Sequence, residues 1–253
     1  MHFLSIFVFK IVSLKQNFMQ IFYKILASTI FFGVLITHAY AQDSLSKKES
    51  PFSFNTDIVS SYIWRGSMIS NVPNIQPYFS FSKKGIEIGS WGSAAINGDY
   101  SELDIYAAYT FKTFKLLVTD YYVFSGYDDE NYFSYANNKT AHSFEGTLSF
   151  TGTDKLPLKI LAATFFYGYD KNISGNNYYS TYFEATYSFK DIDIILGATP
   201  SEGLYADDAG LVNAGFTAHK EIKITEHFSI PSTFSLMANP SAEKVFFVAG
   251  FTF

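Results

Sequence analysis

Apolar and polar residues alternate along most of the chain from about residue 54 to the C-terminus. Alternation with a period of two is typical of β-strands that present one apolar face, and short polar clusters between such runs indicate turns. The pattern predicts an all-β fold with twelve strands. We expect them at residues 54–65, 75–83, 85–96, 101–112, 114–125, 142–151, 157–168, 179–190, 192–199, 210–222, 228–237 and 244–253.

The connections between these strands alternate in length. Tight turns such as 83–85 and 112–113 follow the even-numbered strands, and long polar loops such as 126–141 and 169–178 follow odd-numbered ones. This arrangement predicts an antiparallel transmembrane β-barrel of about 12 strands, with long loops on one rim and short turns on the other. A soluble sandwich or lipocalin-like barrel is the alternative, but strands of about ten residues suit a tilted membrane crossing better.

Aromatic residues are concentrated near the ends of the expected strands, which is typical of the interfacial girdles of membrane barrels. The expected girdle residues are Tyr62, Trp64, Tyr78, Phe79, Trp91, Tyr121, Tyr122, Phe124, Phe165, Tyr167, Tyr187 and Phe189. The last strand alternates strictly and ends on Phe251 and Phe253. It resembles the C-terminal strand signature that barrel-assembly machinery recognises, so we expect Phe251 and Phe253 to form an assembly signal.

The N-terminal 41 residues have the order of an export signal. Lys24 provides the positive region, residues 25–36 are apolar, and Ala39-Tyr40-Ala41 forms a small-x-small cleavage site. We therefore predict a signal peptide at 1–41, a short periplasmic lead-in at 42–53 and an integral outer-membrane barrel at 54–253. A buried helix is the alternative for this segment. We expect Met19 to be the true start, with residues 1–18 upstream of it, although a long positive region is a second possibility.

Composition excludes several classes of protein. The 253 residues include 18 basic residues, 23 acidic ones and no cysteine, which removes disulfides and thiolate zinc sites from consideration. A chain with one arginine and a net charge of −5 does not fit a nucleic-acid partner. The longest apolar run is shorter than the ~18–20 residues that a membrane helix needs.

The charged residues of each strand indicate which side faces the lumen, because a charge at the centre of the lipid face costs roughly 2–4 kcal/mol. Tyr106, Tyr182 and Phe246 are also expected to point inward and narrow the lumen. Acidic rings favour cations, so an acidic lumen predicts weak cation selectivity. The candidate lumen-lining residues are Asp57, Arg65, Glu87, Asp104, Glu145, Glu184 and Glu221, with Arg65 expected high in the first strand beside Asp104 and Glu145.

The first strand and the segment after it carry a motif, D-x-x-S-x-Y-x-W-R-G followed by P-N-I-Q-P. The motif resembles the opening signature of the TorF family of porins, and residues 91–93 and 102–109 resemble its next blocks. This resemblance implies an outer-membrane β-barrel with a channel role. The residues that carry it are Asp57, Tyr62, Trp64, Arg65, Gly66, Gln76 and Pro77.

Catalytic chemistry is not indicated. Outside the predicted signal peptide the chain has only His142, His219 and His227, and His142 and Ser143 are adjacent, so they point to opposite faces of a strand. We expect no cofactor, no metal site and no enzyme activity. The expected partners are outer-membrane lipid, lipopolysaccharide, the barrel-assembly machinery and small solutes. The predicted function is a porin for passive passage of small solutes, with a non-conducting structural or surface-interaction barrel as the alternative and an outer-membrane enzyme as the least favoured.

Overall fold

The computed structural model describes residues 50–124, 131–136 and 139–253. The predicted signal peptide and most of the lead-in lie outside the described residues, so the structure does not bear on them. No helix in the described part of the chain is long and apolar enough to cross a membrane.

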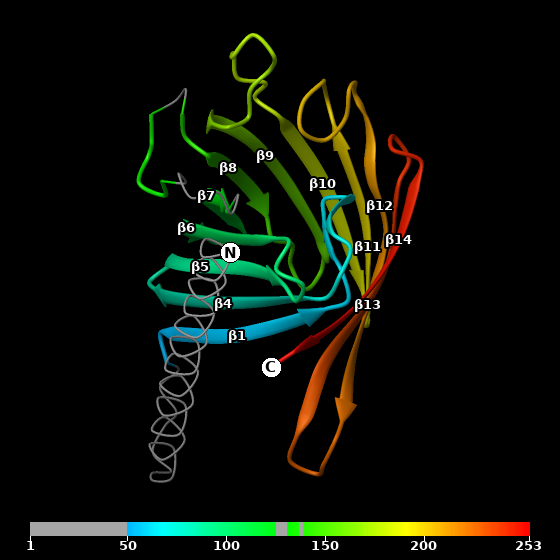
Figure 1. The fold of residues 1–253 in the computed structure, drawn as a ribbon. Coiled ribbons are helices and arrows are strands. Elements are labelled where there is room, and N and C mark those ends of the chain that lie inside the picture. The colour runs from blue at the N-terminus through cyan, green and yellow to red at the C-terminus, as the bar shows by residue number, and fades with distance from the viewer. Residues whose placement is uncertain (1–49, 125–130, 137–138) are drawn as a thin grey trace, which may run out of the picture. The chain divides into compact units, whose positions relative to one another are not determined.

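Twelve antiparallel strands close into a barrel (Figure 1). Each strand of the wall pairs with the next one along the chain, and the first strand also pairs with the last to close the ring. The wall strands are β1 (Phe52–Val59), β4 (Asn74–Lys83), β5 (Ile86–Ala95), β6 (Ser101–Phe111), β7 (Phe114–Val123), β8 (His142–Phe150), β9 (Leu158–Gly168), β10 (Thr181–Phe189), β11 (Ile192–Thr199), β12 (Gly210–Lys223), β13 (Ser229–Asn239) and β14 (Lys244–Thr252). The predicted all-β antiparallel barrel is confirmed.

The alternating pattern determines the two faces of the wall. In β6, Glu102 and Asp104 are buried, whereas Ile105 and Tyr109 are exposed on the opposite face. Neighbouring strands repeat this arrangement, and their exposed positions carry large apolar side chains such as Ile88. An extensive exposed apolar surface around a closed barrel is typical of a wall in contact with lipid. The fold is therefore that of a transmembrane β-barrel.

The first predicted strand is wrong in its second half. β1 ends at Val59, and the following residues form a separate two-stranded hairpin of β2 (Tyr62–Trp64) and β3 (Ser67–Ser70). Its two turn residues, Arg65 and Gly66, have φ values of 49° and 79°. A two-residue turn with both φ values positive suits the twist of a hairpin, so the chain reverses here instead of extending the wall.

This inner hairpin, β2–β3, crosses the lumen. The ring of Trp64 packs against Tyr121 of β7 and Phe165 of β9, with centroids 5.8 and 6.3 Å apart. Strands β7–β9 lie on the far side of the closed wall from β1, from which the hairpin departs. The hairpin therefore spans the barrel and occupies its interior.

The inner hairpin changes the interpretation of the aromatic residues. Half of the expected interfacial girdle lies inside the barrel, because these side chains belong to the hairpin or to the inward face of the strands around it. The residues that the girdle prediction misplaced are Tyr62, Trp64, Tyr78, Trp91, Tyr121 and Phe165. The predicted inward positions of Tyr106, Tyr182 and Phe246 agree with their burial.

Residues 131–136 of the long loop after β7 lie against the outer face of the wall. His142 and Asp120 face outward, and the His142 Nδ1 atom lies 2.7 Å from Asp120 Oδ1. The His142 Nε2 atom lies 2.5 Å from the carbonyl oxygen of Tyr132, and the ring of Tyr135 stacks on the imidazole. Residues 131–136 thus cover a polar pair on the outside of the barrel.

Candidate functional site

The tip of the inner hairpin is anchored by a buried ion pair. The Arg65 guanidinium donates from Nη1 to Glu145 Oε2 at 2.5 Å and from Nη2 to Oε1 at 2.8 Å. The side chains are 11% and 1% exposed. A bidentate pair is among the strongest contacts that a carboxylate makes. Removal of either partner would leave the other charge buried and unpaired, which makes this contact expensive to break.

Hydroxyl groups satisfy the remaining lone pairs of Glu145. Tyr121 and Thr147 donate to its Oε1 at 3.2 and 3.0 Å. The hydroxyl of Tyr205, in the loop between β11 and β12, accepts from Arg65 Nη1 and donates to Glu145 Oε2 at 3.5 Å. Burial raises the pKa of Tyr205 above its ordinary value, so this hydroxyl keeps its proton and remains a donor.

Aromatic rings lie around the Arg65 guanidinium. The Arg65 Cζ atom lies 4.5 Å from the ring centroid of Trp64 and 4.8 Å from that of Tyr182. Cations within about 6 Å of an aromatic centroid are attracted to the ring face. The rings also exclude water from the ion pair, since Tyr182 is fully buried.

The turn of the hairpin fits closely against the wall. The Asn239 amide donates to the Gly66 carbonyl oxygen at 3.1 Å. A Cβ atom at Gly66 would lie 1.9 Å from the backbone oxygen of Val212 in β12. Only glycine therefore allows both this close approach and the positive φ.

Among the described residues, a cavity lies on each side of the hairpin. The loop-side cavity, of about 460 Å³, includes Tyr100, Tyr169 and Leu204 from the connections at the long-loop rim. The turn-side cavity, of about 350 Å³, includes Glu87 and Lys115, which lie close to tight turns. Both cavities share one partition, formed by Tyr62, Trp64 and Tyr121.

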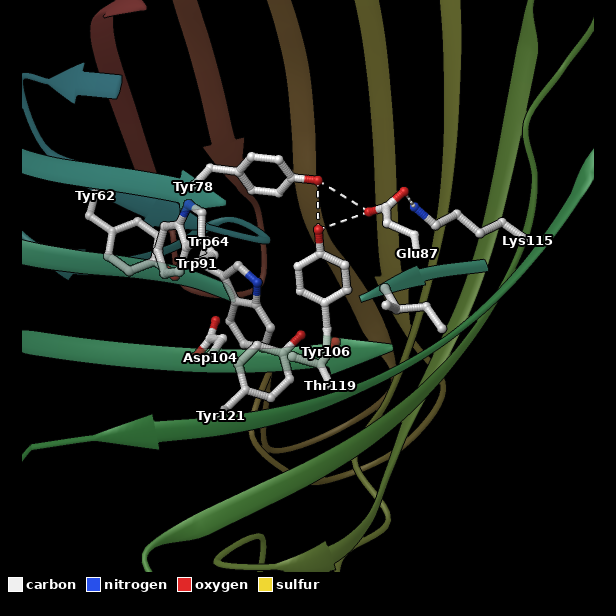
Figure 2. Close-up of a pocket in the computed structure, with 11 residues that line it drawn as sticks. Tyr62, Trp64, Tyr78, Glu87, Trp91, Asp104, Tyr106, Lys115, Thr119 and Tyr121 are labelled. Atoms are coloured by element: carbon white, nitrogen blue, oxygen red, sulfur yellow. Dashed lines mark hydrogen bonds and ion pairs between the residues drawn. The ribbon is translucent and has the colours of Figure 1, made fainter. Parts of the chain in front are cut away.

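One carboxylate of the turn-side cavity is fully engaged (Figure 2). Glu87 Oε1 accepts hydrogen bonds from Tyr106 at 2.8 Å and from Tyr78 at 3.1 Å, and Lys115 lies 3.4 Å from its Oε2. The two hydroxyl oxygens lie 2.6 Å apart, so Tyr106 shares its single proton between Glu87 and the Tyr78 oxygen. This network holds Glu87 against one wall of the cavity.

The other carboxyl group of this cavity, that of Asp104, has fewer hydrogen-bond partners than Glu87. Asp104 is 5% exposed, and its Oδ1 atom is buried without a hydrogen-bond partner among the described residues. Glu102, two positions earlier on the same face of β6, accepts from Tyr100 at 2.7 Å and lines the loop-side cavity. In the described part of the chain neither carboxylate has a salt-bridge partner.

The structure brings together four of the predicted lumen residues and separates the other three. Arg65 pairs with Glu145, and Glu87 and Asp104 share the turn-side cavity. Asp57 instead accepts from Thr252 at 2.6 Å, and Glu184 accepts from Tyr182 at 2.6 Å, both along the wall. Glu221 is exposed. It lies in the end of β12 that extends beyond β11, where the β12 backbone pairs with β13 alone.

The remaining motif residues and the C-terminal residue belong to the barrel wall. Gln76 faces inward and donates to Ser93 at 3.3 Å, while Pro77 is exposed on the outer face. The Phe253 backbone exchanges two 3.0 Å hydrogen bonds with Thr56 and so extends the closing seam between β14 and β1. The expected role of Phe251 and Phe253 in assembly stays a prediction.

Several residues of the site were not among the predicted ones, namely Trp91, Glu102, Lys115, Tyr121 and Tyr205. For Trp91 a signal was present, because it lies four positions after Glu87 in the same strand and therefore shares its inward face. Tyr205 belongs to a loop, and no periodicity indicates where a loop residue points.

No protein-family model matches the chain, and a search of curated proteins likewise finds no match. The resemblance of residues 57–66 to the TorF family therefore stays a prediction.

Proposed function

We propose that this protein is an outer-membrane channel for small solutes in which the inner hairpin controls passage. The observation that carries the proposal is the pair of cavities on the two sides of the hairpin, which meet at the partition of Tyr62, Trp64 and Tyr121. A barrel built only for support has no need of internal space at both ends. Displacement of this single element would join the two cavities.

The charges around the cavities favour cations. Lys115 and Arg65 are each engaged by a carboxylate, while Asp104 and Glu102 have no basic partner among the described residues. Acidic groups along a narrow path raise the local concentration of cations. The proposed channel is therefore weakly cation-selective. The predicted signal peptide and the TorF resemblance support an outer-membrane location.

Planar-bilayer recordings test the proposal. Val59 and Asn74 are directly paired across β1 and β4, so a short Gly- and Ser-containing turn can replace residues 60–73 without lengthening the wall. We expect small, infrequent conductance steps from the wild type, with a reversal potential that indicates cation preference, and large, steady steps from the deletion variant. Anion preference in the wild type would contradict the acidic-lumen part of the proposal.

The alternative is a non-conducting barrel whose lumen is permanently closed. The observation that favours it is the buried Arg65–Glu145 pair, which secures the hairpin strongly. In that case the wild type never conducts while the deletion variant does, and the variant then serves as proof of insertion. If neither protein conducts although both run as heat-modifiable barrels on gels, the channel proposal is wrong.

A further inference from the structure

We propose that the turn-side cavity binds a small organic ammonium cation, held against its aromatic wall and beside the carboxyl group of Asp104. The inference deepens the proposed function by naming the class of solute. It rests on that function only for the route by which the solute reaches the cavity.

The first argument is charge. Burial of a lone carboxylate costs several kcal/mol unless an opposite charge or a proton compensates it. Glu87, in the same cavity, has Lys115 and two tyrosine hydroxyls around it. Asp104 has a buried Oδ1 atom with no hydrogen-bond partner in the described part of the chain. Either a proton or a cation that enters the cavity is therefore expected to neutralise Asp104, and the proposed ligand takes the place of the proton.

The second argument is the composition of the wall around Asp104. Figure 2 shows the rings of Tyr62, Trp64, Trp91 and Tyr121 grouped around its carboxylate. The centroids of Tyr62 and Trp91 are 5.4 Å apart, and those of Trp64 and Tyr121 are 5.8 Å apart, so the rings of each pair pack against each other and together form an aromatic wall of the cavity. Ring faces attract alkylated ammonium groups, with tryptophan the strongest. Because Arg65 already lies over the ring of Trp64, Trp91 is the tryptophan that we expect to face the cation, with Asp104 beside it.

The third argument excludes other ligands. A metal ion needs several oxygen or nitrogen ligands, and in the described part of the chain no three His, Asp or Glu side chains are grouped to provide them. Two carboxylates, Glu87 and Asp104, disfavour an anion. The volume of about 350 Å³ lies at the lower end of the range for small-molecule sites. A compact organic cation fits these limits.

The two tryptophans give the binding test a specific signal. Trp64 and Trp91 are the only tryptophans of the chain, and both line the turn-side cavity. The full barrel is titrated in micelles of an uncharged detergent with choline chloride while tryptophan emission is recorded. A parallel titration uses 3,3-dimethyl-1-butanol, which has the shape of choline without its charge. We expect a saturable change with choline and binding of the alcohol at least about tenfold weaker.

Matched variants separate charge from shape. Asp104→Asn keeps the size of the side chain and should weaken choline binding roughly 10- to 100-fold, as expected for loss of a charge-assisted contact. Trp91→Leu keeps the charge and should also weaken binding, with Trp64 as the remaining reporter. Glu184→Gln changes an inward carboxylate outside the cavity and should leave the affinity unchanged. Heat-modifiable migration on gels confirms that each variant is folded.

Three results would overturn the proposal. The first is equal binding of choline and the neutral alcohol, and the second is an unchanged choline affinity in Asp104→Asn. The third is displacement of bound choline by sodium chloride at concentrations similar to that of choline itself. The last result would indicate an inorganic-cation site. Because the titration needs no membrane, choline binding by a wild type that never conducts supports this site while it refutes the channel. Conduction without choline binding supports the channel and refutes this site.

Discussion

The carboxyl groups at the two ends of the inner hairpin differ in how fully they are hydrogen-bonded. At its tip, Arg65 and Glu145 form an ion pair in which hydroxyl groups satisfy the remaining lone pairs of the carboxylate. At its base, Tyr62 lies beside Asp104, whose Oδ1 atom has no hydrogen-bond partner among the described residues. The satisfied end anchors the hairpin in the lumen, whereas the other end lies beside a carboxyl oxygen that the proposed ligand would engage. The anchor and the proposed binding site thus lie at opposite ends of the hairpin, each completed by a carboxyl group from the wall.

The largest effect is expected when the anchored end is broken. Arg65→Met keeps most of the volume but leaves Glu145 buried and unpaired, so we expect the hairpin to lose about 3–5 kcal/mol of stability. Urea titration followed by tryptophan emission measures this loss, because Trp64 lies in the hairpin. The double variant Arg65→Met/Glu145→Gln is the control and should recover most of the loss. A single variant as stable as the wild type would show that the ion pair is not the anchor.

A substitution in the turn should displace the hairpin by a different route. Gly66→Ala places a methyl group 1.9 Å from the Val212 oxygen at a φ of 79°, and we expect a loss of about 1–3 kcal/mol with larger conductance steps. Gly98→Ala is the matched control, since Gly98 has a φ of 80° but no atom within 4 Å of its added Cβ. Similar losses of stability in both variants would mean that the loss comes from backbone strain at a positive φ and not from a clash with β12.

This turn also shows how far the sequence could predict the fold. The twelve wall strands follow from alternation, because a barrel wall with one apolar face imposes a period of two on every strand. The inner hairpin was missed because residues 54–65 continue to alternate past Val59. The Arg65-Gly66 pair has the same positive-φ form as the tight turn at Lys84-Gly85, and a basic residue followed by glycine was therefore an available signal.

The candidate site could be predicted only in part. The inward positions of Glu87 and Asp104 follow from the parity of their strands. The engagement of one and not the other depends on which side chains from β4, β6 and β7 reach each carboxylate. Such contacts join residues far apart in sequence, so no local pattern specifies them.

At the base of the hairpin we expect a substitution to raise stability, in contrast to the losses expected at the tip. Asp104→Asn replaces a buried carboxyl group that has no salt-bridge partner among the described residues, so we expect stability to rise by about 1 kcal/mol when no organic cation is present. Glu87→Gln is the control and should lower stability slightly, because Lys115 loses its partner at 3.4 Å. The same urea titration measures both. A loss of stability in Asp104→Asn would mean that the carboxylate is satisfied in the ligand-free barrel, and the proposed contrast between the two ends would fail.

The smallest effect is expected at the edge of the anchored end. Tyr205→Phe removes the hydroxyl that accepts from Arg65 and donates to Glu145 at 3.5 Å, but the bidentate contact stays in place. We therefore expect a loss of about 0.5–1.5 kcal/mol, well below that of Arg65→Met. Tyr178→Phe is the matched control, because its hydroxyl donates to Glu202 in exposed loops and should shift the titration midpoint by nothing measurable. If Tyr205→Phe destabilises the hairpin as much as Arg65→Met, the anchor is a network in which the loop between β11 and β12 contributes as much as the ion pair.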